Sequence, residues 1–212
     1  MPNTPRRLTP LEARVLGVLV EKERTVPDTY PLSLNALVAG CNQKTSRSPL
    51  MEVSETEAKQ ALDELRSLSL VVESSGGRVM RYAHNVPRVL AIPTESAAIV
   101  ATLMLRGPQT PGELRINTER LHRFADISSL EAYLAELAAR PAGALVAELP
   151  RAPGARENRW AHLLCGAPAP MAVDDAHVSS PGMTCGDEDR VAALEARIAR
   201  LEDAIAALRT AR

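Results

Sequence analysis

The sequence predicts a mainly α-helical chain with small β-hairpins, an α+β fold in which one small unit occurs twice. The phrase Arg81-Tyr82-Ala83-His84 returns as Arg159-Trp160-Ala161-His162, and an upstream helical phrase, Leu62–Leu65, returns as Leu134–Leu137. Self-similarity at this period indicates a duplicated domain. Each copy reads as three helices followed by a β-hairpin, which is the winged-helix order. We therefore expect two tandem winged-helix domains, and docking of nucleic acid or protein ahead of catalysis.

The expected domain boundaries follow the duplication. The first winged-helix domain spans residues 1–90 and the second spans 91–165. Residues 166–187 are rich in Pro, Gly, Ala, Ser and Asp, a composition typical of a flexible linker. Residues 188–212 return to a regular apolar spacing, and we expect them to form a coiled-coil helix.

Helix starts are legible from their N-terminal caps. In a capping box, a Ser or Thr accepts a hydrogen bond from an orphan backbone N–H, and a Glu three residues later reaches back to the cap. Four such pairs are Thr9 with Glu12, Ser54 with Glu57, Thr110 with Glu113 and Ser128 with Glu131. They predict helices near 10–24, 55–69, 111–121 and 129–140, and apolar spacing predicts two more near 33–41 and 95–106.

After each third helix the pattern changes to that of strands. Leu70–Glu73 and Arg78–His84 predict a hairpin that turns at Gly76-Gly77. In the second copy, Ala144–Leu149 and Asn158–Leu164 flank a longer tip rich in Pro, Gly and Arg. These tips are expected to be the wings.

Composition excludes several classes of protein. Of the 212 residues, 45% are apolar and 2% aromatic, which suits small helical units with aliphatic cores. The formal net charge is −1, and no segment of the chain has the strong positive field of a tight, nonspecific DNA binder. The three cysteines are too few and too scattered for a disulfide framework. No apolar run approaches the roughly 20 residues of a membrane span, and no signal-peptide stretch is found, so we expect a cytoplasmic protein without membrane contact.

The last helix carries a regular heptad, which predicts a homodimer. β-branched residues fill position a and Leu fills position d, a choice that favours a parallel two-stranded coiled coil. Arg190 and Arg197 would meet Glu195 and Glu202 of a second chain along its flanks. The alternative is an amphipathic helix that lies on its own domain. The dimerisation residues are Val191, Leu194, Ile198, Leu201, Ile205 and Leu208.

Polar and basic residues around the first copy's third helix form the candidate nucleic-acid site. The segment Cys41–Pro49 leads into that helix and concentrates amides, hydroxyls and basic groups suited to phosphate oxygens and base edges. The alternative is a structural loop whose Asn and Gln satisfy buried backbone groups. The expected contacts are Asn42, Gln43, Lys44 and Arg47 from the loop, Lys59 and Arg66 from the helix, and Arg78 and Arg81 from the wing.

The charge of the third helices favours a different partner, a protein. The first of them carries four carboxylates beside its two basic residues, and the second carries Glu131 and Glu136 with no basic residue before Arg140. An acidic helix meets repulsion in a groove lined by phosphates. A dimeric protein-interaction scaffold is therefore the alternative to a DNA-binding, transcription-regulator-like protein.

No enzyme signature is found in the chain, which has neither a phosphate-binding loop nor a Gly-x-Ser-x-Gly elbow. His84 and His162 recur at equivalent places, which favours packing over catalysis. The ring of Tyr82 or Trp160 would cover the core, with the neighbouring Arg and Ala on the other face of the strand. His162 and Cys165 lie at an odd offset on a strand and lack further metal ligands at sensible spacing. We expect no catalytic residue, metal or cofactor.

Four longer phrases resemble the YceH family, bacterial proteins of unassigned biochemical function. They are Leu8–Gly17, Tyr30–Asn35, Cys41–Thr45 and Leu105–Leu114, and together they cover both copies. The resemblance implies tandem winged-helix domains and a terminal heptad helix. It implies no catalytic residue, because the family has none assigned, and a DNA role taken from it rests on fold analogy.

Overall fold

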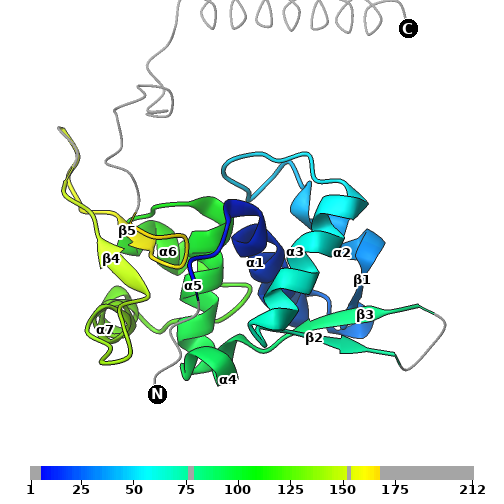
Figure 1. Ribbon diagram of the computed structural model, residues 1–212. Coiled ribbons are helices and arrows are strands. Elements are labelled where there is room, and N and C mark those ends of the chain that lie inside the picture. Colours follow the sequence, from blue (N-terminus) through cyan, green and yellow to red (C-terminus); the bar gives the residue numbers. More distant parts are fainter. Residues whose placement is uncertain (1–5, 76–78, 152–153, 168–212) are drawn as a thin grey trace, which may run out of the picture. The chain divides into compact units, whose positions relative to one another are not determined.

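The computed structural model describes residues 6–75, 79–151 and 154–167, all within one compact unit, Met1–Pro170. Helices and short antiparallel strands give an α+β architecture (Figure 1). The first copy contains α1 (Pro10–Thr25), a 3₁₀ turn η1 (Pro27–Thr29), β1 (Leu32–Ser33), α2 (Leu34–Cys41), α3 (Glu55–Ser67), β2 (Val71–Ser74) and β3 (Arg81–His84). After α4 (Val86–Leu90), the second contains α5 (Thr94–Arg106), α6 (Pro111–Thr118), α7 (Ile127–Ala138), β4 (Val146–Glu148) and β5 (Trp160–His162).

Each helix expected within the described residues is present, with its ends within a few residues of those predicted. The capping boxes at Thr9, Ser54 and Thr110 are confirmed, since both hydrogen bonds of each box are formed. The fourth capping box is wrong. Asp126 caps α7 in place of Ser128, because its carboxylate accepts from the Ser129 N–H at 2.7 Å and the helix starts at Ile127.

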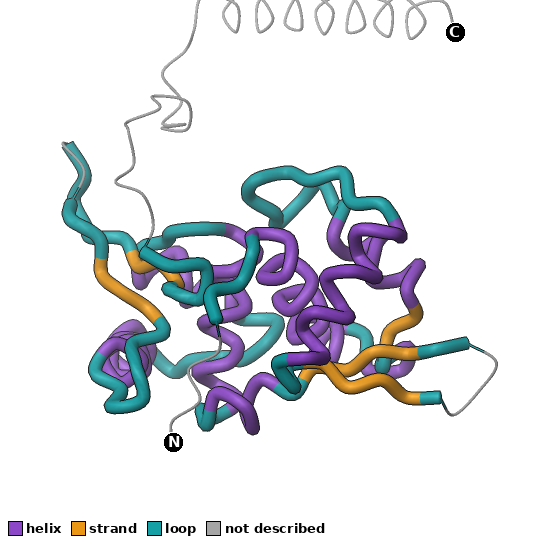
Figure 2. Tube along the Cα trace, in the orientation of Figure 1, coloured by secondary structure: helices purple, strands orange, loops and turns teal. Residues whose placement is uncertain are grey.

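The strands pair with the same register in both copies. β3 lies between β1 and β2 in one sheet, and β5 pairs with β4 in the other (Figure 2). The short β1 was not expected from the sequence, and a single bridge takes its place in the second copy. The equivalent pairs are Val71–His84 with Val146–His162, Glu73–Tyr82 with Glu148–Trp160, and Leu32–Tyr82 with Gln109–Trp160.

A repeated arginine ties each copy's last strand to the segment before its second helix. Arg81 donates to the carbonyl of Pro31 at 2.8 Å, and Arg159 donates to the carbonyl of Pro108 at 2.9 Å. Each proline directly precedes the residue that pairs with the aromatic side chain of the last strand. The two copies thus share their strand register and the hydrogen bond from this arginine to the proline carbonyl.

The core runs through both copies, since their buried apolar side chains form one continuous cluster. The opening helices α1 and α5 pack on each other, and a Cβ at Gly17 would lie 3.0 Å from the Leu105 side chain. The backbone N–H of Ser48 also donates to the carbonyl of Leu105 at 2.8 Å. No break in the core marks the expected boundary at 90/91, and the domain limits stay predictions.

The aromatic residue of the last strand does not behave alike in the two copies. Tyr82 is buried in the core, as expected, whereas Trp160 is half-buried and Ala161 beside it is buried. Alternate residues of a strand face opposite sides. Both faces of β5 are therefore covered in part: the indole packs against the core, as expected, and Ala161 on the other face is buried as well.

Several expectations fall outside the described residues. They are the turn at Gly76-Gly77, the wing residue Arg78, most of the 166–187 linker and all six heptad residues of the 188–212 helix. Among the helices that the structure does describe, none combines the length and the apolar character that crossing a bilayer requires.

Candidate nucleic-acid interface

The predicted loop contact Asn42 has a structural role. Its Nδ2 donates to the carbonyl of Val53 at 2.9 Å, and the Val53 N–H donates to its Oδ1 at 2.7 Å. The side chain thus satisfies both backbone groups of a buried residue, which is what the structural alternative required.

Arg47, the second basic group of the loop, is buried with its side chain fully enclosed. Its guanidinium donates to Glu21 through both terminal nitrogens, at 3.2 and 2.6 Å. Its Nε donates to the carbonyl of Gly40 at 3.0 Å, and a terminal nitrogen also donates to Gln43 at 2.6 Å. Burial raises the pKa of Glu21, but the bonds from Arg47 outweigh burial and hold that pKa below its ordinary value. The Arg47 guanidinium is therefore out of reach of a phosphate.

The other two loop residues are exposed. The Oε1 of Gln43 accepts from Arg47 and, at 3.3 Å, from the ammonium of Lys22. Lys44 has no polar partner among the residues that the structure describes. Of the four predicted loop contacts, Lys44 alone offers a charge that is not already paired.

The two basic residues of α3 are paired within their own copy. The ammonium of Lys59 lies 3.1 Å from Asp63 and 3.2 Å from Glu73, and Arg66 lies 2.6 Å from Glu73. Lys59 also sits 5.5 Å from the ring centre of Tyr82. Desolvation lowers the pKa of Lys59, but its carboxylate partners raise that pKa by more. The pKa therefore lies above its ordinary value, and the ammonium stays charged.

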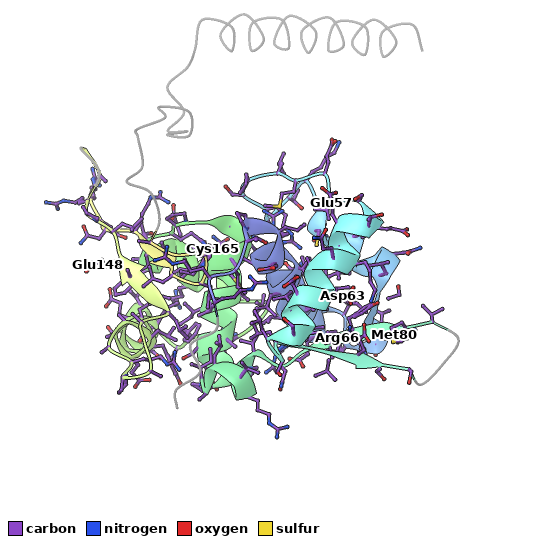
Figure 3. The ribbon with its side chains drawn as sticks, in the orientation of Figure 1. Glu57, Asp63, Arg66, Met80, Glu148 and Cys165 are labelled. Atoms are coloured by element: carbon purple, nitrogen blue, oxygen red, sulfur yellow. The ribbon has the colours of Figure 1, made fainter. Side chains whose placement is uncertain are left out.

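The outward face of α3 is acidic. Glu55, Glu57 and Glu64 are exposed along it, and Figure 3 shows Glu57, Asp63 and Arg66 distributed from one end of the helix to the other. The exposed Arg81 on β3 donates to the carbonyls of Thr29 and Pro31. The structure does not gather the predicted contacts into one positive face.

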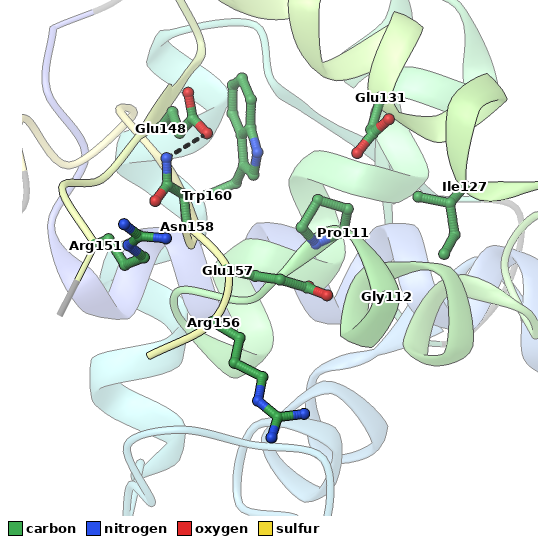
Figure 4. Close-up of a pocket in the computed structure, with 10 residues that line it drawn as sticks. All are labelled: Pro111, Gly112, Ile127, Glu131, Glu148, Arg151, Arg156, Glu157, Asn158 and Trp160. Atoms are coloured by element: carbon green, nitrogen blue, oxygen red, sulfur yellow. Dashed lines mark hydrogen bonds between the residues drawn. The ribbon is translucent and has the colours of Figure 1, made fainter. Parts of the chain in front are cut away.

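A feature missed by the sequence is a hollow of about 500 Å³ in the second copy (Figure 4). It lies between the start of α6, the helix α7 and the β4–β5 ribbon. Its apolar wall consists of Trp160, Ile127 and Pro111 with Gly112. Its charged and polar rim consists of Glu131, Glu148, Glu157, Arg151, Arg156 and Asn158. We call it the tryptophan hollow.

In the first copy, a lysine of the chain itself occupies the corresponding place. Ser54 caps α3 and Asp126 caps α7, and Lys59 and Glu131 each stand five positions after the cap. The strands place Glu73 and Glu148 opposite the aromatic residue in both copies. Lys59 bonds Glu73 over the ring of Tyr82, whereas Glu131 cannot pair with Glu148. This exchange of lysine for glutamate is visible in the sequence once the two copies are aligned on Leu62–Leu65 and Leu134–Leu137.

A smaller hollow of about 220 Å³ lies between α1, the loop 43–46, α5 and the end of α6. Three basic side chains line it, Lys22, Arg106 and Arg120. Arg106 donates to the hydroxyl of Ser46 at 2.6 Å, and the exposed Arg120 has no polar partner in the described part of the chain. We call it the junction hollow.

Comparison with known proteins identifies the family. The model of a family described as "Protein of unknown function, DUF480" matches residues 8–155. The chain belongs to the DUF480 family. A UPF0502 protein of Dechloromonas aromatica (strain RCB) is 60% identical over 201 residues, which cover 94% of each chain. A UPF0502 protein of Burkholderia orbicola (strain MC0-3) is 60% identical over 212 residues, 98% of this chain and 89% of the relative. Another, from Burkholderia vietnamiensis (strain G4), is 68% identical over 165 residues, 78% of this chain and 70% of the relative.

The resemblance drawn from the sequence is thus confirmed at the level of an uncharacterised bacterial family, and the name YceH stays a prediction. Neither the DUF480 description nor the names of these relatives states an activity. Any function for this DUF480 chain has to be argued from its own surfaces.

Proposed function

We propose that this chain is a non-catalytic docking protein built from two winged-helix units, and that it binds a protein partner at the tryptophan hollow. One observation supports this most strongly. The place that Lys59 fills in the first copy is open in the second, over a half-buried indole. Aromatic side chains in partly enclosed pockets, surrounded by a polar rim, are the usual anchors of protein interfaces.

The charge of α3 supports a protein partner over DNA at that helix. Lys59 and Arg66 are paired with carboxylates of their own copy, and the exposed face adds further glutamates. A recognition helix in the major groove lies between two rows of phosphates. The acidic face would be repelled there, while it suits a partner of positive charge.

The predicted homodimer belongs to the same proposal. A coiled coil through the heptad from Val191 to Leu208 would present two hollows to one partner and raise avidity without any new contact. Sedimentation of the full chain beside a Leu194→Glu/Leu201→Glu variant tests it. Equal sedimentation of the two, at the mass of a monomer, would remove the dimer and leave the hollow unaffected.

The docking role is tested by affinity capture with a matched pair of variants. Ile127 is 45% exposed at the wall of the hollow, and Ile116 is 71% exposed on α6 outside it. We expect a nuclease-resistant partner to be retained by the wild type and by Ile116→Glu, and to be lost with Ile127→Glu. Retention by Ile127→Glu, or loss of the partner on nuclease treatment, would contradict docking at this site.

A second candidate, DNA binding, is favoured by the unpaired basic groups near the junction hollow. Lys44 and Arg120 are exposed without polar partners among the described residues. Within the same residues, the Arg106 guanidinium donates one hydrogen bond, to Ser46, and its other N–H groups can still donate. Phosphate contacts of this kind make affinity fall steeply with salt. Titration of duplex DNA at low salt tests this, with Lys44→Glu/Arg120→Glu beside Arg88→Glu, a control on α4. Absence of binding by the wild type removes this candidate.

A further inference from the structure

We infer that the tryptophan hollow receives a lysine or arginine side chain of the partner. The inference deepens the proposed docking role and depends on it. It is carried by the internal comparison of the two copies, because the first copy already holds the corresponding side chain in place.

In the first copy, the occupant is the lysine of α3. Its ammonium is bonded by Asp63 and Glu73, donates to the hydroxyl of Tyr82 at 3.4 Å and lies 5.5 Å from the centre of that ring. An ammonium over an aromatic face is attracted by the partial negative charge that the ring's quadrupole places on that face, and a carboxylate beside it adds direct charge pairing. The first copy therefore contains a receptor for a basic side chain, and its own Lys59 occupies that receptor.

In the second copy, the aromatic ring and one carboxylate of the receptor are kept, Ala135 takes the place of Asp63, and the cation is missing. Glu148 stands where Glu73 stands, and Trp160 replaces Tyr82 with the ring that binds cations best. The position of Lys59 is taken by Glu131, which adds a second carboxylate to the rim. Figure 4 shows Glu148 and Glu131 on either side of the indole.

The chain's own arginines do not fill the receptor. Arg156 is directed away from the indole (Figure 4), and no ion pair joins Arg151 or Arg156 to a rim carboxylate among the described residues. The Oε1 of Glu148 accepts only from the neutral amide of Asn158, at 2.8 Å. Three rim carboxylates, Glu131, Glu148 and Glu157, are thus left without a cation in the described part of the chain. With Arg151 and Arg156 counted, the rim has a formal charge of −1, which disfavours a phosphate or an acidic peptide and favours a cation.

The experiment uses the indole itself as the reporter, because Trp160 is the single tryptophan of the chain. The full-length protein is titrated with acetylated, amidated Gly-Lys-Gly and Gly-Arg-Gly, and with the matching norleucine peptide, which keeps an apolar stem without the charge. We expect a saturable change in tryptophan emission with the two basic peptides that weakens with salt, and none with norleucine. An equal response to norleucine, or no saturable response to either basic peptide, would overturn the inference.

A matched pair of variants locates the binding. Glu131→Lys copies the first copy's lysine into the hollow, whereas Glu136→Lys makes the same charge change on an exposed part of α7 outside it. We expect Glu131→Lys to weaken peptide binding by at least about tenfold and to raise the thermal midpoint above that of Glu136→Lys. Peptide binding by Glu131→Lys equal to that of Glu136→Lys would count against the site. If Ile127→Glu still releases the partner while basic peptides fail to bind, the result supports docking at the tryptophan hollow. It rejects the inference that a lysine or arginine side chain occupies the hollow.

Discussion

At the scale of single residues, burial decides which of the predicted contacts are free to bind. Arg47 and Lys44 lie in the same loop and have the same formal charge, but one is enclosed by Glu21 and backbone carbonyls while the other faces solvent. A sequence gives the charge of each residue but not the side of the loop on which it lies. The amide of Asn42 illustrates the same point, because its residue type suits a base edge as well as the backbone of Val53, to which it bonds.

Replacement of Arg47 tests its structural role. Arg47→Ala leaves the carboxylate of Glu21 partly buried without its main partner, and breaking such a pair costs about 3–5 kcal/mol. We expect the free energy of unfolding in urea to fall by that order. Lys44→Ala is the control and should change it by less than about 0.5 kcal/mol. Similar effects of the two substitutions would show that Arg47 is not the buried anchor described.

The second prediction at this scale concerns pH. Burial lowers the pKa of His162 from 6.5 to about 4, and its Nδ1 has no hydrogen-bond partner among the described residues. Between those two values the unfolded chain binds a proton that the folded chain does not, so stability falls as pH falls through this window. We expect the wild type to lose on the order of 2 kcal/mol more than His162→Gln between pH 7 and pH 5. Parallel pH profiles of the two proteins would refute this.

At the scale of helices and strands, local chemistry was the most predictable part of the fold. Caps act within three residues, so α1, α3 and α6 could be placed from Thr9, Ser54 and Thr110 alone. The strand β1 could not, because its two residues become a strand only by pairing with β3, far along the chain. The tryptophan hollow could not be predicted from the sequence either, because it forms only where α6, α7 and the β4–β5 ribbon come together.

The start of α7 gives the prediction at this scale. Asp126 and Ser128 are both acceptable caps by residue type, and the structure assigns the bond to Asp126. We expect Asp126→Ala to lower the free energy of unfolding by about 1 kcal/mol and Ser128→Ala to change it by less than about 0.5 kcal/mol. Denaturation in urea at neutral pH measures both. A larger loss from Ser128→Ala would return the cap to the position expected from the sequence.

At the scale of the whole described unit, the duplication predicted from the sequence gives two copies with one interior. The sequence could indicate the repeat but not the contact between copies, since α1 and α5 read simply as apolar opening helices. Gly17 marks where they meet, because any side chain there runs into Leu105. The two copies are therefore expected to unfold together.

Two spectroscopic probes that report on different parts of the chain test whether the copies unfold together. Far-ultraviolet circular dichroism reports on helices of both copies, whereas Trp160 reports on the second copy alone. We expect coincident transitions in urea. Gly17→Val should lower both midpoints equally, by about 1–3 kcal/mol in stability. Gly112→Ala is the control, because its Cβ meets only Thr110 at 3.9 Å. Separate transitions would mean that the copies are thermodynamically independent.

The hydrogen bond from the N–H of Leu8 to the carbonyl of Leu164, 2.8 Å long, has a consequence for biosynthesis. Leu8 leaves the ribosome early, and its acceptor is translated near the end of the described residues. At roughly 5–20 residues per second, the interval is on the order of ten seconds. The backbone N–H of Leu8 therefore lacks this acceptor through nearly all of that elongation, and the hydrogen bond can form only after both copies have been made.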